Sequence, residues 1–241
     1  MNPRLYQIDS YMREFNTEVV EHDAEVKALA LAQTAFYPGG GGQPCDTGWL
    51  IFPNKKLRIW QVKVQNRKIW HYYKEDFQLT DIQVQGKLDW ARRYDLMRTH
   101  TAMHILSAVA WQDYQVQVTG GNMDVLQGHL DFEFETLSAE LIESLEMKIN
   151  QEVKEARRIE VKFLTREQAE KIPDLIRTKV NLLPANLQKI RVVEIEGLDL
   201  QADGGTHVKN TAEVGQIAIT GYKSKGKNNK RIKIALKEEK I

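Results

Sequence analysis

The spacing of the apolar residues changes near residue 95 and divides the chain into two regions. From 17 to 90 the chain consists of short segments separated by Gly, Pro, Asn or Asp, which read TEVVEHD, KALALAQTAFY, GWLIF, LRIWQVKVQ, KIWHYYK and IQVQGKLDW. Segments rich in Val, Ile, Trp and Tyr are typical of strands, and many short strands favour a small barrel that closes on itself. We therefore predict a β-barrel domain over residues 1–90.

After residue 95 the apolar residues recur at helical spacing. One stripe of a first helix, with Asp95 as its expected N-cap, consists of Leu96, Met103, Leu106 and Ala110. A second helix is predicted in SAELIESLEMKINQEVKEAR, with Ser138 as its N-cap. Strand-like segments surround these helices: GHLDFEFE, IEVKFL, IRVVEIEG, GQIAITGY and RIKIAL. We predict an α+β domain over residues 91–241, with helices packed on a mostly antiparallel sheet, and an α+β fold for the chain.

The composition limits the kinds of site that the chain can build. The N-terminal segment MNPRLYQIDSYMREF lacks the apolar core of a signal peptide, and no run of eighteen apolar residues occurs, so we expect a cytoplasmic protein without a membrane partner. Cys45 is the single cysteine, which excludes a multi-cysteine zinc cluster. A metal site would therefore need His, Asp or Glu ligands.

Two pairs of side chains have the spacing of metal ligands. RTHTAMHIL places His100 and His104 on one face of the first predicted helix, and DGGTH contains Asp203 and His207. Both patterns have other interpretations. Paired helical histidines are often partly buried polar residues, and Asp-Gly between apolar segments is a strong hairpin signal. A hairpin turn and half of a metal site are both open for DGGTH.

A glycine-rich segment and a basic segment also stand out. QTAFYPGGGGQPCDTG is either a flexible loop or an ordered backbone that exposes amide donors, with Gln43 presenting its side-chain amide. YKSKGKNNKRIK, residues 222–233, carries six Lys or Arg and no acid, although the whole chain has a net charge of only +1. This segment suits phosphates, and it also suits a solvated hairpin whose lysines protect an exposed edge.

Three motifs in order, GGGGQ, HTAMH and GGTHV, resemble the editing domain of alanyl-tRNA synthetases and its free-standing AlaX-type relatives. The resemblance covers most of residues 28 to 237. The chain is similar to the medium-sized free-standing form, in which a β-barrel precedes the editing domain. It implies a hydrolase that acts in trans on mischarged tRNA(Ala), chiefly the seryl ester and also the glycyl ester. The implied partner is this tRNA and not DNA.

The resemblance also implies roles for particular residues. The family's zinc ligands correspond to His100, His104 and His207, and Asp203 occupies the position of the family's cysteine, so the expected cofactor is one Zn²⁺ held by three histidines and an aspartate. A metal-free site in which Asp203 only holds a histidine is the alternative, and it corresponds to a tRNA-binding module with impaired catalysis. An esterase acting on another acylated molecule is a third possibility.

Substrate recognition is assigned in the same way. Gln43 is expected to orient the substrate or a water molecule, and the Thr34 hydroxyl is expected to bond the hydroxyl of serine, which alanine lacks. The residues expected to meet tRNA phosphates are Lys223, Lys225, Lys227, Lys230 and Arg231.

Overall fold

The structure is a computed structural model, and it describes residues 4–172, 175, 188–226 and 229–237. The chain divides into two compact units, Met1–Asp95 and Leu96–Ile241. The domain boundary predicted between residues 90 and 91 lies slightly before this division, and the assignment of separate domains stays a prediction. Within the described residues, no helix has both the length and the apolar character needed to cross a bilayer.

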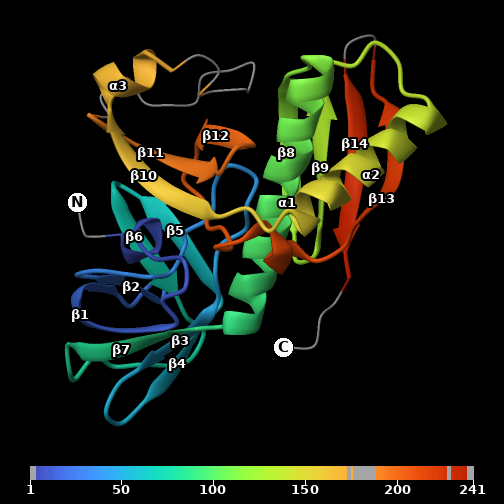
Figure 1. The fold of residues 1–241 in the computed structure, drawn as a ribbon. Coiled ribbons are helices and arrows are strands. Elements are labelled where there is room, and N and C mark those ends of the chain that lie inside the picture. The colour runs from blue at the N-terminus through green and yellow to red at the C-terminus, as the bar shows by residue number, and fades with distance from the viewer. Residues whose placement is uncertain (1–3, 173–174, 176–187, 227–228, 238–241) are drawn as a thin grey trace. The chain divides into compact units, whose positions relative to one another are not determined.

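The N-terminal unit is an antiparallel sheet of seven strands in the order β4-β3-β7-β1-β2-β6-β5 (Figure 1). Its elements are η1 (Leu5–Gln7), β1 (Glu14–Asp23), β2 (Ala28–Leu31), β3 (Gly48–Ile51), β4 (Lys56–Ile59), β5 (Gln61–Gln65), β6 (Lys68–Tyr72) and β7 (Gln83–Leu88). Strands β4 and β5 form the two edges, and no ladder joins them among the described residues. The strand-rich unit was predicted correctly, but the closed barrel is not confirmed.

The core of this unit is built from alternate residues of its strands. In β1 every second residue from Phe15 to Val19 is buried, as expected for a strand with one face on a core. Phe15 lies opposite Gly86 of β7, and a Cβ added at Gly86 would lie 2.3 Å from the Phe15 ring. The ring therefore occupies the space that a side chain at Gly86 would need.

The second unit contains two antiparallel sheets and the helices that pack on them (Figure 1). One sheet has the order β10-β11-β12 and the other β13-β14-β9-β8. Helix α1 (Trp90–Tyr114) begins before the division at Asp95 and continues into the second unit. The elements that follow it are β8 (Val118–Asp124), β9 (Gln127–Phe132), α2 (Ala139–Lys154), β10 (Ile159–Thr165), α3 (Arg166–Glu170), β11 (Lys189–Ile195), β12 (Asp199–Ala202), η2 (Thr211–Val214), β13 (Ile217–Ser224) and β14 (Lys230–Leu236). The chain is thus α+β with antiparallel sheets, as predicted.

The predicted start of the second helix is confirmed, and that of the first is wrong. The Ser138 hydroxyl accepts a hydrogen bond from the Leu141 amide, as expected of an N-cap. Helix α1 begins at Trp90, five residues before the predicted cap at Asp95. Its first turn buries the charged side chain of Arg93 in place of an apolar one, so a search for apolar spacing did not detect it.

Candidate metal centre

Four residues of the second unit gather at one buried point. His100 and His104 of α1, His207 and Asp203 each offer one ligand atom, and these atoms all lie within 4.8 Å of one another. His100, His104 and His207 are 6%, 8% and 3% exposed. The structure therefore brings together the four residues that the sequence analysis selected.

Alternation along two strands explains this arrangement. In the three-stranded sheet, Leu200 and Ala202 of β12 pack against an apolar cluster. Because successive side chains of a strand point to opposite faces, Asp199 and Gln201 lie on the other face, and Asp203 follows at the end of the strand. Neighbouring β11 alternates in the same way, which turns Arg191 toward Asp203.

DGGTH does not form the hairpin that was considered for it. Strand β12 ends at Ala202, and residues 203–208 continue without regular structure toward η2. Neither Gly204 nor Gly205 is among the glycines with positive φ, which a tight primed turn requires. The segment instead passes the helix with Asp203 and His207 on the side of the cluster.

Asp203 is held by several donors. Its Oδ2 atom accepts a hydrogen bond from the Gly205 amide at 2.7 Å and lies 3.1 Å from His207 Nε2 and 3.5 Å from Arg191 Nη1. Its Oδ1 atom lies 3.6 Å from His100 Nε2. Arg191 also donates to the Asp203 carbonyl at 2.7 Å. These contacts fix the carboxylate beside the imidazoles.

The protonation states suit a metal ion. Burial lowers the pKa of His207 to about 4 and that of His100 well below its ordinary value, so both imidazoles are neutral near pH 7 and keep a lone pair. Burial alone would raise the pKa of Asp203, but attraction to His100 and the hydrogen bond with His207 hold this pKa well below its usual range. Two neutral imidazoles, the third imidazole of His104 and a carboxylate form a donor set that zinc accepts.

Two residues that sequence reasoning missed contact the outer nitrogens of the histidines. His207 Nδ1 lies 3.1 Å from Thr101 Oγ1, and His104 Nδ1 lies 3.4 Å from Asp199 Oδ2. Thr101 lies inside the quoted HTAMH motif and Asp199 shortly before DGGTH, so proximity in sequence was an available signal.

The glycine-rich segment of the N-terminal unit is an ordered loop. Gly39 to Gly42 have φ values of 84°, 132°, 57° and 87°, a region that only glycine enters readily. Gly40 and Gln43 exchange backbone hydrogen bonds of 3.0 and 2.9 Å. The interpretation as an ordered backbone therefore fits better than that of a flexible loop.

A buried ion pair closes the base of this loop, and neither partner was predicted. Asp46 accepts from the Tyr37 amide at 2.6 Å, and Arg93 Nε lies 2.9 Å from Asp46 Oδ1. The side chains of Asp46 and Arg93 are 1% and 0% exposed. Arg93 also donates to the carbonyls of Ser10 at 2.9 Å and Ala35 at 2.6 Å, which joins three segments of the unit.

The predicted recognition residues Thr34 and Gln43 are both buried in the N-terminal unit, at 2% and 3% exposure. His71 Nδ1 lies 3.1 Å from the Leu29 carbonyl, which can only accept, so Nδ1 carries the proton. His71 Nε2 must then accept from the Thr34 hydroxyl at 2.9 Å. Thr34 Oγ1 also accepts from the Phe36 amide, so its proton is directed at His71.

The basic segment forms the hairpin of β13 and β14, where its cations differ in environment. Lys223 and Lys225 are exposed. Arg231 Nε donates to Asp131 Oδ1 at 2.7 Å, and Lys225 lies 3.2 Å from Asp131 Oδ2. Lys230 is 5% exposed and donates to the Gly226 carbonyl. Lys227 lies outside the described residues.

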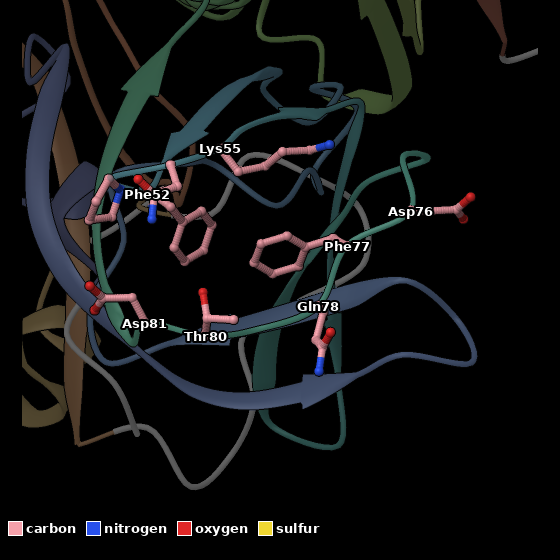
Figure 2. Close-up of a pocket in the computed structure, with 9 residues that line it drawn as sticks. Phe52, Lys55, Asp76, Phe77, Gln78, Thr80 and Asp81 are labelled. Atoms are coloured by element: carbon pink, nitrogen blue, oxygen red, sulfur yellow. The ribbon is translucent and has the colours of Figure 1, made fainter.

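A separate pocket of about 250 Å³ lies in the N-terminal unit, lined by residues 52–55, 76–78, 80 and 81. Figure 2 shows the rings of Phe52 and Phe77 next to each other at this pocket, with Asp76 extending away from them. The ring centroids are 4.9 Å apart. The pocket contains none of the candidate metal ligands or recognition residues.

Two family models of tRNA synthetases match parts of this chain. Residues 190–233, which include DGGTH and most of the basic hairpin, match the family model of the threonyl and alanyl tRNA synthetase second additional domain. Residues 6–92 match the model of class II (A) tRNA synthetases.

Curated relatives cover nearly the whole chain. Alanyl-tRNA editing protein AlaX-M of Saccharolobus solfataricus is 38% identical over 98% of this chain and 100% of its own length. AlaX-M of Methanosarcina mazei is 33% identical over 99% of this chain and 98% of its own length. The alanine–tRNA ligase of Thermococcus kodakarensis is 34% identical over 89% of this chain but only 23% of its own length. The chain therefore belongs to the AlaX family of alanyl-tRNA editing proteins.

Proposed function

We propose that the protein is a trans-editing hydrolase that cleaves the ester bond of mischarged tRNA(Ala) in the cytoplasm, chiefly the seryl ester and also the glycyl ester. Water adds to the ester carbonyl, and free amino acid and tRNA leave. The observation that carries the proposal is the buried cluster of His100, His104, His207 and Asp203 in a chain of this family.

The four residues of the cluster would hold one divalent metal, for which we propose zinc. The neutral imidazoles of His100 and His207 and the ionised carboxylate of Asp203 fit this ion without a further change of protonation at Asp203. When bound, the metal supplies Lewis-acid stabilisation of the charge that develops on the ester oxygen. Arg191 lies beside the carboxylate of Asp203 and keeps it oriented, and Thr101 orients the ring of His207.

We propose that the N-terminal unit, a barrel-like module carrying the glycine-rich loop, selects the amino acid through Thr34 and Gln43. The Thr34 hydroxyl donates its proton in a hydrogen bond to His71 Nε2, so the Thr34 oxygen can only accept from a substrate. The serine hydroxyl can donate to this oxygen, whereas alanine and glycine cannot. Gln43 is proposed to orient the substrate or water with its amide.

We propose that the tRNA backbone binds the basic hairpin. Its exposed lysines, Lys223 and Lys225, are the stronger candidates among the predicted residues. Arg231 is held by Asp131, which leaves part of its guanidinium for a phosphate, and Lys230 supports the turn. For Lys227, the proposal of a phosphate contact rests on the sequence alone.

The test is a deacylation assay with seryl-, glycyl- and alanyl-tRNA(Ala), run with metal-depleted protein and with zinc restored. We expect rapid loss of the seryl ester, slower loss of the glycyl ester, little loss of the alanyl ester, and recovery of activity with zinc. Absence of turnover on every ester in both preparations would refute the hydrolase. Full turnover after complete metal removal would refute the metal but leave the hydrolase.

One observation favours an alternative, a tRNA-binding module with impaired catalysis. Asp203 already has partners in Gly205, Arg191 and His207, so the site is electrostatically satisfied without a metal. This alternative predicts tRNA binding without deacylation, which the same preparations distinguish.

A further inference from the structure

Asp199 is a buried carboxylate that the proposed mechanism does not use. Its side chain is 0% exposed, and its Oδ2 atom lies 3.4 Å from Nδ1 of His104. Burying a carboxylate is costly unless something compensates for it, so its position beside a candidate metal ligand requires an explanation.

We propose that Asp199 is a positioning residue of the metal centre, which holds His104 with its proton on Nδ1 and so leaves Nε2 to bind the metal. The inference deepens the proposed function because it rests on the metal bound by His100, His104, Asp203 and His207.

Two features place Asp199: the alternation of side chains along β12 and one hydrogen bond between the start of this strand and helix α1. Asp199 begins β12, two positions before Gln201 and four before Asp203, on the face opposite the apolar cluster. Gln112 of α1 donates to the Leu198 carbonyl at 2.9 Å, which ties the start of the strand to the helix that carries His104. Gln201 Nε2 donates to Asp199 Oδ2 at 2.7 Å and fixes the carboxylate.

The chemistry follows from the two nitrogens of the ring. A carboxylate only accepts hydrogen bonds, so the nitrogen that faces it carries the proton and the other nitrogen presents its lone pair. The separation of 3.4 Å exceeds the usual range of roughly 2.7–3.2 Å, so a shift of a few tenths of an ångström completes the bond. Such a carboxylate orients a metal-bound histidine and increases its basicity.

Charge gives a second reason. Arg191 lies beside Asp203 and offsets one carboxylate of the site, which leaves Asp199 to balance part of the charge of a divalent cation. Thr101, which contacts His207, is neutral and cannot do this. Loss of Asp199 would therefore weaken metal binding through both orientation and charge.

The test compares Asp199→Asn with Asp131→Asn, a matched control in the same unit. As whole residues the two aspartates are 5% and 6% exposed, and Asp131 pairs with Arg231 and not with a ligand histidine. Zinc affinity is measured by competition with a chromophoric chelator. We expect Asp199→Asn to bind zinc about 10–100-fold more weakly and Asp131→Asn to bind it like the wild type.

A second measurement reports the tautomer of His104 directly. Nitrogen-15 NMR of the zinc-free wild type reports which nitrogen of His104 carries the proton, and we expect Nδ1. In Asp199→Ala we expect the Nε2-protonated form to appear, whereas a purely structural role would leave the tautomer unchanged.

The outcomes separate this inference from the proposed function. Unchanged zinc affinity in folded Asp199→Asn, a wild type that binds no zinc, or an Nε2-protonated His104 would each overturn the positioning role. Weakened zinc affinity in a protein that hydrolyses no aminoacyl-tRNA at saturating zinc would support the positioning role and refute the hydrolase.

Discussion

At the scale of single residues, the oxygen at position 203 would determine how tightly the proposed metal is held. Where the family resemblance expects cysteine, this chain presents Asp203 with Arg191 against it. A carboxylate is a harder and weaker donor to zinc than a thiolate, and the arginine competes for the same oxygen. Zinc should therefore be held less tightly here than by a site with a thiolate.

The substitution Asp203→Cys tests this point. We expect zinc affinity to rise on the order of tenfold or more, because a thiolate replaces the carboxylate and Arg191 no longer competes for an oxygen. Competition with a chelator measures the change, and Asp203→Ala, which removes the ligand, should bind zinc more weakly than the wild type. Equal affinity of Asp203→Cys and the wild type would contradict the prediction.

The proposed selection of serine by Thr34 belongs to the residue scale. Thr34→Val removes the oxygen that we propose accepts the serine hydroxyl, and it should lower the ratio of seryl to alanyl ester hydrolysis about 10–100-fold. Thr34→Ser keeps the oxygen and serves as the control. The ratio of rate constants on the two charged tRNAs is the measurement, and an unchanged ratio in Thr34→Val would refute the assignment.

At the scale of elements, the glycine-rich loop is stabilised by the ion pair beneath it. Arg93→Met would leave the carboxylate of Asp46 buried without its partner, which costs about 3–5 kcal/mol. Chemical denaturation measures the loss. The double variant Arg93→Met with Asp46→Asn removes both charges and should be more stable than the single variant. If Arg93→Met had the same free energy of unfolding as the wild type, the ion pair would not be what stabilises the loop.

The β13–β14 hairpin gives a comparison between an exposed and a buried cation. Lys223→Gln should weaken tRNA binding for every tRNA sequence and reduce the salt dependence of log K by about 1. Lys230→Gln should leave that salt dependence nearly unchanged, because Lys230 is buried and donates to Gly226. Binding is measured by salt titration. Equal slopes for the two variants would mean that exposure does not identify the phosphate contacts.

The sequence predicted those elements and residues that are marked by a short motif or by regular apolar spacing over a few neighbouring positions. The four candidate ligands were selected from two short motifs, and β1, β9 and α2 follow clear apolar spacing. Strand β8, which reads VTGGNMD, was missed because it lacks a regular apolar alternation. Asp46 and Arg93 were missed because partners 47 residues apart leave no local pattern.

The errors have related causes. Asp-Gly at 203–204 indicated a hairpin, but the Asp203 side chain contacts His100 of α1 and Arg191 of β11, and local turn preference does not include such contacts. The predicted cap at Asp95 failed because Arg93 is buried by an ion pair and not by apolar character.

At the scale of the whole molecule, the dependence of stability on pH is set by buried neutral histidines. Burial lowers the pKa of His71 from 6.5 to about 4, which outweighs the hydrogen bond to Leu29 that raises it. Between these pH values the unfolded chain binds a proton that the folded chain does not. Stability should therefore fall as pH falls from 6.5 toward 4.

Urea denaturation at pH 7.5 and pH 5 tests this expectation. The His71 contribution alone should make the protein about 2 kcal/mol less stable at the lower pH. In His71→Asn, the difference in the free energy of unfolding between the two pH values should be smaller by that amount. The same pH dependence in the variant and the wild type would assign the effect to other groups.

The alternation of β12 has a consequence for insertions and deletions. Odd-numbered residues of this strand face the metal centre and even-numbered ones face the apolar cluster. Deleting one residue within β12 would reverse the faces of the residues on one side of the deletion, which would turn Asp199 or Asp203 away from the histidines. Deleting two would preserve the assignment of faces and shorten the strand. Length variation at this position among functional relatives should therefore occur in steps of two.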